Sequence, residues 1–384
     1  MRFEFGTAGR ILFGAGAVRE VALATKEMGR RALVVTGRRA EPSAWLMKQL
    51  ESAGVPCLPF RVGGEPTLGL VRSGLESARE GVCDLVISFG GGSAIDAGKA
   101  IAALLTNPGE PQDYLEVVGR GQPLGHGPAP FIAVPTTAGT GSEVTRNAVL
   151  ALPEHRVKVS LRSPLMLPRL AVVDPELTLG LPPAVTASTG LDALTQLIEP
   201  YVSIRATPLT DGFCLEGLGR VSRSLRPAYR QGNDLEARTD MALASLMGGL
   251  ALANAGLGVV HGFAAPVGGM FPAPHGAVCA ALLPHGMATN IRVLRSRAPE
   301  SQALRRYETV ARLLTGNPEA EPAEGVRWVS ELCRELGIAP LRSYGIDASD
   351  VPILVEGASR ASSTKGNPII LTADELREIL IASL

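Results

Sequence analysis

The feature that most constrains the fold is a regular alternation of short β-branched runs and helical stretches in the first half of the chain. Alternation at this spacing is typical of a parallel sheet whose strands are joined by crossover helices. The predicted strands are 32–36, 55–62, 85–89, 131–134 and 170–174, and the predicted helices are 43–53, 68–80 and 94–105. The first half is therefore predicted to form an α/β domain.

The second half follows a different pattern. Pro182 and Pro183 bar a helix before them and suit the first turn of a helix after them. Beyond them, apolar residues recur at steps of three and four, which predicts helices. The predicted helices are 184–202, 209–225, 235–255, 303–314, 323–336 and 373–383. We therefore expect two domains, an α/β domain over residues 1–180 and an all-helical domain over residues 181–384.

Composition excludes several classes of protein. The 384 residues carry 37 Lys and Arg against 37 Asp and Glu, whereas nucleic acids and anionic membranes are bound by clustered positive charge. Five cysteines, widely spaced, encode neither a disulfide framework nor a CxxC metal motif. Glu4 interrupts the apolar core that a secretory peptide needs, and Asn254 and His261 interrupt the longest apolar region. We expect a cytoplasmic protein, off the membrane, that acts on small molecules.

Three successive glycines, residues 90–92, follow a buried predicted strand and precede a predicted helix. Glycines let the backbone approach a ligand closely, and the free amides and positive dipole of a helix start suit a pyrophosphate. The alternative is a tight turn in which Ser93 and Asp96 form a capping box. The GxGxxG fingerprint of the Rossmann fold is absent.

A second loop, PTTAGTGSEVT at residues 135–145, leaves another strand of the same predicted sheet. Hydroxyls and glycines at the carboxyl end of a strand suit hydrogen bonds to a phosphate, a ribose or a carboxamide. A solvated turn is the alternative for this loop alone.

The second half carries a candidate metal site. Asp192 and Gln196 lie four residues apart in a predicted helix and share one face. His261 and His275 flank a Gly/Pro-rich segment in a chain with only five histidines. A lone histidine in an apolar stretch is usually a core residue, but two with a carboxylate favour Zn²⁺ or Fe²⁺ with a position open for a substrate oxygen. A purely structural role for Asp192 and the two histidines is the alternative.

The chain carries a series of motifs in a fixed order: GGGSAIDAGK (90–99), PTTAGTGSEVT, DPEL (174–177), GLDAL (190–194) and the two histidine motifs. In this order and spacing, the chain resembles the iron-containing (group III) alcohol dehydrogenases. The resemblance covers residues 5–368, essentially the whole chain. It implies a Rossmann-like nucleotide-binding domain followed by a helical metal domain, in a dehydroquinate synthase-like architecture. It also implies NAD(P)-dependent interconversion of small alcohols and carbonyl compounds in the cleft between the domains. The family is commonly dimeric or larger, so we expect a homo-oligomer.

The resemblance also implies roles for individual residues. Asp192, His261 and His275 would be catalytic and, with Gln196, would hold the metal. The residues implied on the cofactor side are Gly91, Gly92, Ser93 and Asp96 for the pyrophosphate and ribose, Thr136, Thr137 and Thr140 for the nicotinamide, Lys158 for the ribose, and Asn147 near the substrate.

The end of the first predicted strand bears on the choice between NAD and NADP. Family members that use NAD typically carry an Asp there, which repels a 2′-phosphate, whereas this chain has Gly37 followed by Arg38 and Arg39. A guanidinium can bind a phosphate with charge-assisted hydrogen bonds. We expect NADP to be accepted at least as well as NAD; solvated surface arginines are the alternative.

Two positions depart from the family pattern, which has His where Gln196 stands and often a further His at the position of Ala265. A Gln carbonyl is a weaker ligand than an imidazole, so we expect weak metal binding and a reduced preference for iron over zinc. Three other functions stay open at this point: a metal-independent reductase of the maleylacetate reductase type, a metal-dependent lyase or synthase of the dehydroquinate synthase type, and a nucleotide-binding homologue without activity.

Overall fold

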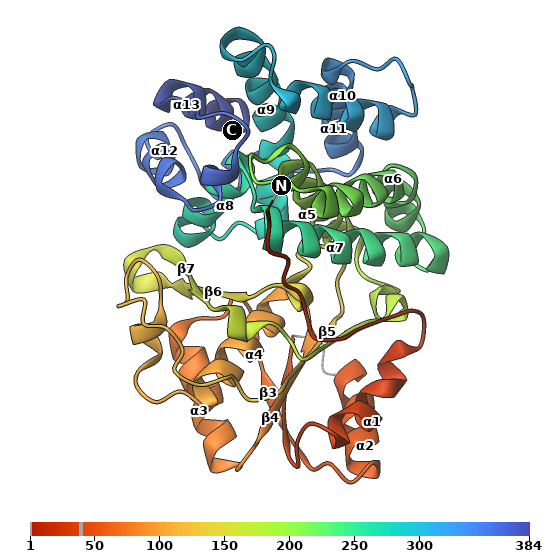
Figure 1. Cartoon of the computed structure of the whole chain (residues 1–384), viewed down its shortest axis with the longest axis vertical. Coiled ribbons are helices and arrows are strands. Elements are labelled where there is room, and N and C mark those ends of the chain that lie inside the picture. The colour runs from red at the N-terminus through yellow and green to blue at the C-terminus, as the bar shows by residue number, and fades with distance from the viewer. Residues whose placement is uncertain (1, 38–40) are drawn as a thin grey trace. The chain divides into compact units, whose positions relative to one another are not determined.

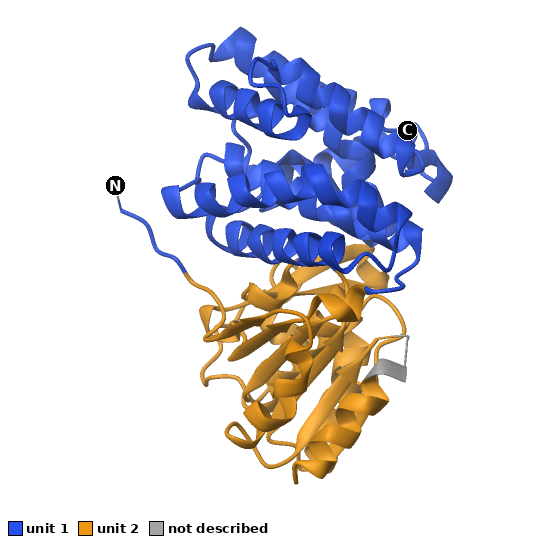
Figure 2. Cartoon of the chain, turned by 90° about the vertical axis from the view of Figure 1, so that its right-hand side faces the viewer, with its two compact units in different colours: residues 1–5, 138–140, 179–384 blue, residues 6–137, 141–178 orange. Residues whose placement is uncertain are grey.

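The computed structural model describes residues 2–37 and 41–384 and divides into two compact units. Unit 2 comprises Gly6–Thr137 and Gly141–Thr178 (Figure 2). Unit 1 comprises the N-terminal residues up to Phe5, Ala138–Thr140 and Leu179–Leu384 (Figure 2). The short segment Ala138–Thr140 thus belongs to the helical unit, although the chain on both sides of it belongs to the α/β unit.

Unit 2 is built on a six-stranded sheet in the order β1-β8-β5-β4-β2-β3, and every neighbouring pair is parallel. The strands are β1 (Ile11–Phe13), β2 (Ala32–Thr36), β3 (Cys57–Arg61), β4 (Leu85–Gly90), β5 (Phe131–Pro135) and β8 (Leu170–Val173). The five predicted strands and the parallel sheet are confirmed. The three-residue β1 was not predicted, because it is too short to show a periodic pattern.

Helices cover both faces of this sheet. Leu33 and Val35 of β2 pack with α3 (Leu68–Glu80) and α4 (Gly92–Leu105) in one core. Ala32 and Val34, whose side chains point to the opposite face, pack with α1 (Val21–Lys26) and α2 (Glu41–Ser52) in another. Burial on both faces explains why the four central strands, β8, β5, β4 and β2, read as continuous apolar runs.

An antiparallel hairpin of β6 (Asn147–Leu152) and β7 (Val157–Arg162) lies outside the main sheet. The hairpin is not evident in the sequence, because β6 is short and its half-buried Val149 and Ala151 are as apolar as its buried residues, so no alternation shows. It follows directly on the hydroxyl-rich loop, so it fixes where that loop ends.

Unit 1 is helical, with helices coloured green to blue in Figure 1. They are α5 (Pro183–Val202), α6 (Pro208–Arg230), α7 (Leu235–Ala255), α8 (Val259–Met270), α9 (His275–Arg297), α10 (Gln302–Thr315), α11 (Pro322–Glu335), α12 (Val351–Arg360) and α13 (Ala373–Ala382). The six predicted helices are confirmed, and α5 begins at Pro183 as its two prolines predict. Three helices were missed; α8 and α9 contain Pro266 and Pro284, which read as breaks in a sequence pattern.

Helix α9 lies at the centre of unit 1. It is long and apolar enough to cross a membrane, as is the bent pair α7 and α8, but 78% of its apolar stretch is buried inside the protein. Residues of α9 share one hydrophobic core with α5, α8 and α10 to α13. This extent of burial is typical of a core helix.

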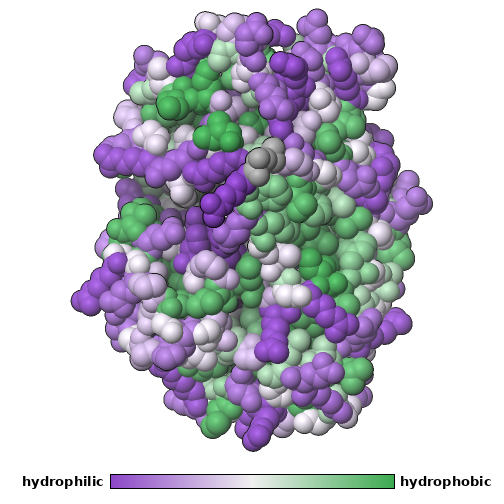
Figure 3. Space-filling view, viewed as in Figure 1, coloured by the Kyte–Doolittle hydropathy of each residue, from purple (hydrophilic) through white to green (hydrophobic). Residues whose placement is uncertain are grey.

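On the surface, hydrophilic and hydrophobic side chains are mixed across the face shown in Figure 3.

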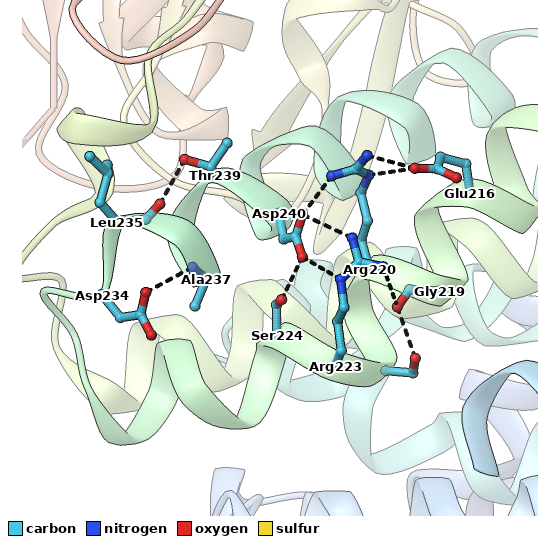
Figure 4. Close-up of polar contacts among 11 residues, drawn as sticks. Glu216, Gly219, Arg220, Arg223, Ser224, Asp234, Leu235, Ala237, Thr239 and Asp240 are labelled. Carbon is cyan, nitrogen blue, oxygen red and sulfur yellow. Dashed lines mark hydrogen bonds and ion pairs between the residues drawn. The ribbon is translucent and has the colours of Figure 1, made fainter. Parts of the chain in front are cut away.

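A buried carboxylate joins α6 to α7 (Figure 4). Asp240 of α7 accepts hydrogen bonds from Arg220 Nη1 at 2.5 Å, Arg223 Nε at 2.7 Å and Ser224 Oγ at 2.6 Å, all on α6. Burial raises the pKa of the Asp240 carboxyl, but the hydrogen bonds from Arg223, Ser224 and Arg220 outweigh burial, and the net direction is downward.

Candidate active site

The candidate metal ligands of unit 1 come from three helices. Asp192 and Gln196 lie on α5, His261 is the third residue of α8, and His275 is the first residue of α9. The approach of α9 to α5 depends on Gly276, because a Cβ there would lie 2.3 Å from the Ser188 carbonyl oxygen. The structure therefore brings all four predicted side chains to one place.

The distances suit a single divalent cation. Asp192 Oδ1 lies 3.4 Å from His261 Nε2 and 3.6 Å from His275 Nε2. Two ligands of a tetrahedral ion with bonds of 2.0–2.1 Å lie roughly 3.4 Å apart. The side chains of Asp192 and His261 are 3% and 6% exposed and that of His275 is 35% exposed, so the cluster is reached from the His275 side.

Unpartnered polar atoms point to the same conclusion. Asp192 Oδ1, Gln196 Oε1 and His261 Nε2 are buried, and none of them forms a hydrogen bond within the described residues. The amide nitrogen of Gln196 donates to the Gly139 carbonyl at 3.3 Å, which leaves its oxygen unpaired. Each unsatisfied buried group costs about 1–3 kcal/mol, and a cation would satisfy all three. The residues present therefore fit a divalent metal.

Glu199 orients one of the imidazoles. Its Oε2 lies 2.7 Å from His261 Nδ1, and its Oε1 accepts a hydrogen bond from the Val260 amide at 2.7 Å. A proton held on Nδ1 by a carboxylate leaves the Nε2 lone pair free for a metal. Gly258 makes room for this contact, since a Cβ there would lie 2.7 Å from Glu199 Oε1. Glu199 was not predicted, although its place seven residues after Asp192 on the same helix face is a usable signal.

Cys279 is the second residue that the sequence patterns missed. It lies one turn after His275 on α9, and its Sγ is 3.7 Å from His275 Nε2. The ligand atoms of Asp192, His261, His275 and Cys279 all lie within 4.8 Å of one another.

The charges of the cluster favour a cation. Burial raises the pKa of the Asp192 carboxyl, but His275 and His261 lower it, and the net direction is downward. Burial lowers the pKa of His261 and of His275, but Cys279 and Asp192 raise it, and the net direction for both imidazoles is upward. The acidic groups thus favour positive charge within the cluster, and a divalent cation would supply that charge.

The glycine-rich loop of unit 2 lies where the strand order reverses. The chain leaves β2 for β3 on one side and returns to β4 on the other, and ligands of open α/β sheets bind outside the carboxyl ends of strands at such a point. Gly37 after β2 and Gly90 at the end of β4 are adjacent there, since a Cβ on Gly90 would lie 3.1 Å from the Gly37 amide nitrogen. The Thr136 amide donates to the Gly90 carbonyl at 3.0 Å, which places the hydroxyl-rich loop beside them.

The start of α4 keeps its amides available. Gly91 is the N-cap, and within the described part of the chain no side chain caps this helix. The alternative of a Ser93–Asp96 capping box is therefore wrong. Asp96 instead accepts hydrogen bonds from Ser142 Oγ at 2.6 Å and from the Val149 amide at 3.1 Å.

Lys99, on α4, ties the two loops together. Its buried ammonium group donates to the Ser142 carbonyl at 2.9 Å, to Thr145 Oγ1 at 2.8 Å and to the Asn147 carbonyl at 2.6 Å. Because a buried charge needs partners on every side, this contact fixes the second loop against α4. The role of Lys99 was not predicted, although the residue closes the GGGSAIDAGK motif.

The other predicted cofactor residues lie as follows. Thr137 is next to Gly91, with its Oγ1 3.4 Å from where a Gly91 Cβ would be. Lys158 lies on β7 with its ammonium group 3.1 Å from Glu65 Oε2, and Thr140 belongs to unit 1. Arg38 and Arg39 lie outside the described residues.

Fold and site together fit a nucleotide-dependent dehydrogenase with a candidate metal site in its helical unit. The model of the iron-containing alcohol dehydrogenases matches residues 8–175, and that of the C-terminal region of the same family matches residues 186–384. The chain belongs to the iron-containing alcohol dehydrogenase family.

Individual relatives agree with this assignment. Alcohol dehydrogenase 4 of Saccharomyces cerevisiae is 36% identical over 96% of this chain and 95% of its own. The NAD-dependent methanol dehydrogenase of Bacillus methanolicus is 32% identical over 96% of both chains. The crystal structure of a 1,3-propanediol oxidoreductase covers 100% of both chains with a TM-score of 0.91 and 33% identity. The predicted family, the dehydroquinate synthase-like fold and the class of enzyme, an NAD(P)-dependent alcohol dehydrogenase that uses a divalent metal, are confirmed.

Proposed function

We propose that this protein reduces small aldehydes with NAD(P)H and oxidises the corresponding primary alcohols, at a metal held by unit 1. The observation that supports the metal most directly is the convergence of three buried, unpartnered ligand atoms, on Asp192, Gln196 and His261. The named substrates of two relatives, methanol and 1,3-propanediol, support a small alcohol.

Each residue of the cluster has a proposed task. Asp192, His261 and His275 hold a zinc or iron ion, and Gln196 offers a carbonyl oxygen as a weak fourth ligand. Glu199 keeps the Nδ1 proton of His261 in place. When bound, the ion supplies Lewis acidity, which polarises a carbonyl group or stabilises an alkoxide.

On the cofactor side, the chain provides fixed donors. Gly91, Gly92, Ser93 and Asp96 bind the pyrophosphate and ribose at the start of α4, the first three through their backbone amides. Asp96 with Lys99 also holds the neighbouring loop in position. Thr136, Thr137 and Thr140 bind the nicotinamide, and Lys158 binds the ribose. Asn147 lies on the side where the substrate binds. When bound, a nicotinamide cofactor would supply hydride transfer.

Further properties follow from the family and the sequence. We infer that residues 1–180 act as the dinucleotide-binding domain and 181–384 as the metal and substrate domain. We also infer that the enzyme is cytoplasmic and assembles as a homo-oligomer, a dimer or larger. With Gly37 at the end of β2, NADP is accepted alongside NAD.

The test is NADH and NADPH oxidation against a panel of short aldehydes, together with calorimetric titration of both nucleotides. Gly92→Val should abolish nucleotide binding, because a branched side chain at the first turn of α4 stands between the amides and the phosphate. Val82→Ala, at an exposed position of the same unit, is the control and should bind normally. If the wild type binds neither nucleotide at millimolar concentration, the proposed function is refuted.

A further inference from the structure

Cys279 is placed to take part in the metal centre. It is fully buried and follows His275 by four residues, so both side chains project from one face of α9. Its Sγ is 3.7 Å from His275 Nε2, and it lies within 4.8 Å of the ligand atoms of Asp192 and His261.

The spacing is that of two ligands on one ion. With a zinc–sulfur bond of 2.3 Å and a zinc–nitrogen bond of 2.0–2.1 Å, a tetrahedral ion holds sulfur and nitrogen about 3.6 Å apart. The observed 3.7 Å between Cys279 Sγ and His275 Nε2 agrees with this value. The pairs from Asp192 Oδ1 to the two imidazoles, at 3.4 Å and 3.6 Å, agree equally well with a common ion.

Two independent observations indicate that a ligand belongs there. Asp192 Oδ1 and His261 Nε2 are buried without a hydrogen bond in the described chain, and the ligand atoms of both residues lie within 4.8 Å of that of Cys279. In addition, the shell lacks a strong ligand, because Gln196 offers only a neutral amide oxygen. A Cys279 thiolate on α9 would supply the strong ligand that Gln196 on α5 does not.

We propose that Cys279 binds the metal as a thiolate, beside Asp192, His261 and His275, and makes the centre select zinc over harder ions such as Mn²⁺. The inference rests on the proposed function, since it concerns the same metal. A metal–sulfur bond forms, and the thiol proton passes to solvent. Thiolate ligands favour zinc, whereas carboxylate and carbonyl ligands suit Mn²⁺. With Cys279 as the fourth ligand in place of the weak Gln196 carbonyl, a zinc ion could accept a substrate oxygen as a fifth.

The direct test is cobalt spectroscopy. The holoenzyme is stripped with chelator, reloaded with one Co²⁺ per chain and compared with Cys279→Ser, Cys279→Ala and the control Cys333→Ala. Cys333 is also buried, and its Sγ contacts the Ala280 carbonyl at 3.4 Å. We expect a thiolate-to-cobalt charge-transfer band in the near ultraviolet for the wild type and for Cys333→Ala. Both Cys279 variants should keep the visible d–d bands of bound cobalt and lose the charge-transfer band.

Metal affinity gives a second measurement. Competition with a chromophoric chelator should show Zn²⁺ affinity falling about 10- to 100-fold in Cys279→Ala, the scale of a perturbed ligand shell, with a smaller loss for Mn²⁺. Should the Cys279 variants fail to fold, X-ray absorption at the zinc edge of the wild type decides, since a sulfur ligand appears at about 2.3 Å.

The outcomes separate the two proposals. Bound Co²⁺ without a charge-transfer band in the wild type, a band that survives in Cys279→Ala, or a zinc shell without sulfur overturns the role of Cys279 and leaves the proposed function intact. A wild type that binds neither Co²⁺ nor Zn²⁺ overturns both.

Discussion

At the scale of single residues, we predict that Gly37 governs the choice between NADP and NAD. A Cβ at this position meets no described atom within 4 Å, so Gly37→Asp fits without strain. The new carboxylate would repel a 2′-phosphate and accept hydrogen bonds from an unmodified ribose. Because a charge-assisted hydrogen bond contributes about 1.5–3 kcal/mol, we expect the ratio of kcat/KM for NADPH to that for NADH to fall about ten- to a hundredfold. Gly127→Asp is the control, because a Cβ there also meets no described atom within 4 Å and the residue precedes β5, at the opposite edge of the sheet. An unchanged ratio would show that the 2′-phosphate does not bind at the end of β2.

The same scale shows which site residues a sequence can reveal. Asp192, Gln196, His261 and His275 could be predicted because their residue types and family motifs point to metal binding. Glu199 and Cys279 were missed, because a Glu in a helix usually faces solvent and a buried Cys usually acts as a small core residue. For Glu199, its seven-residue spacing from Asp192 was the one usable signal. Only the positions of Glu199 on α5 and Cys279 on α9 distinguish them from such residues. Arg38 and Arg39 remain predictions.

At the scale of elements, the contact between α6 and α7 can be tested through Asp240 (Figure 4). Its pKa is lower in the folded chain than the usual 3.8. Its contribution to stability is therefore fully present above the unfolded pKa and is lost as pH falls through the folded pKa. Asp240→Asn should lower the free energy of unfolding by about 1–3 kcal/mol at pH 7 and by less near pH 3. Denaturant titration at both pH values measures the difference. Glu335→Gln removes a partly exposed ion pair with Arg226 and should cost at most about 1 kcal/mol. An equal loss at both pH values in Asp240→Asn would contradict this account.

How closely a helix could be located from the sequence depended on the residues that mark its ends. Helices such as α3 and α7, which follow the capping residues Thr67 and Asp234, could be located closely from periodicity. Helices α8 and α9 could not, because internal proline and clustered glycine normally end a helix. Tertiary packing in the core of unit 1 overrides that local preference. These two helices carry both histidines, so the site's architecture was the least predictable part of the fold.

At the scale of the whole molecule, strand–helix alternation predicted a parallel sheet but not its strand order. The reversal between β2 and β4 brings Gly37 and the glycine-rich loop together. Strand order depends on which face of the sheet each crossover helix covers, and the pattern of residues along the chain does not encode that choice. The helical unit likewise gathers Asp192, His261 and His275 from positions up to 83 residues apart in sequence, through helix packing alone.

The central claim is that catalysis requires a metal held by Asp192, His261 and His275. The most direct test is to measure, on one preparation, metal content and aldehyde-dependent NAD(P)H oxidation before and after exhaustive chelation. We expect activity to fall in proportion to the metal removed and to return with Zn²⁺ or Fe²⁺, because the ligand cluster cannot polarise a carbonyl by itself. His275→Ala should lack both metal and turnover. Full activity in the stripped wild type, retained in His275→Ala, would contradict the claim and identify a metal-independent reductase.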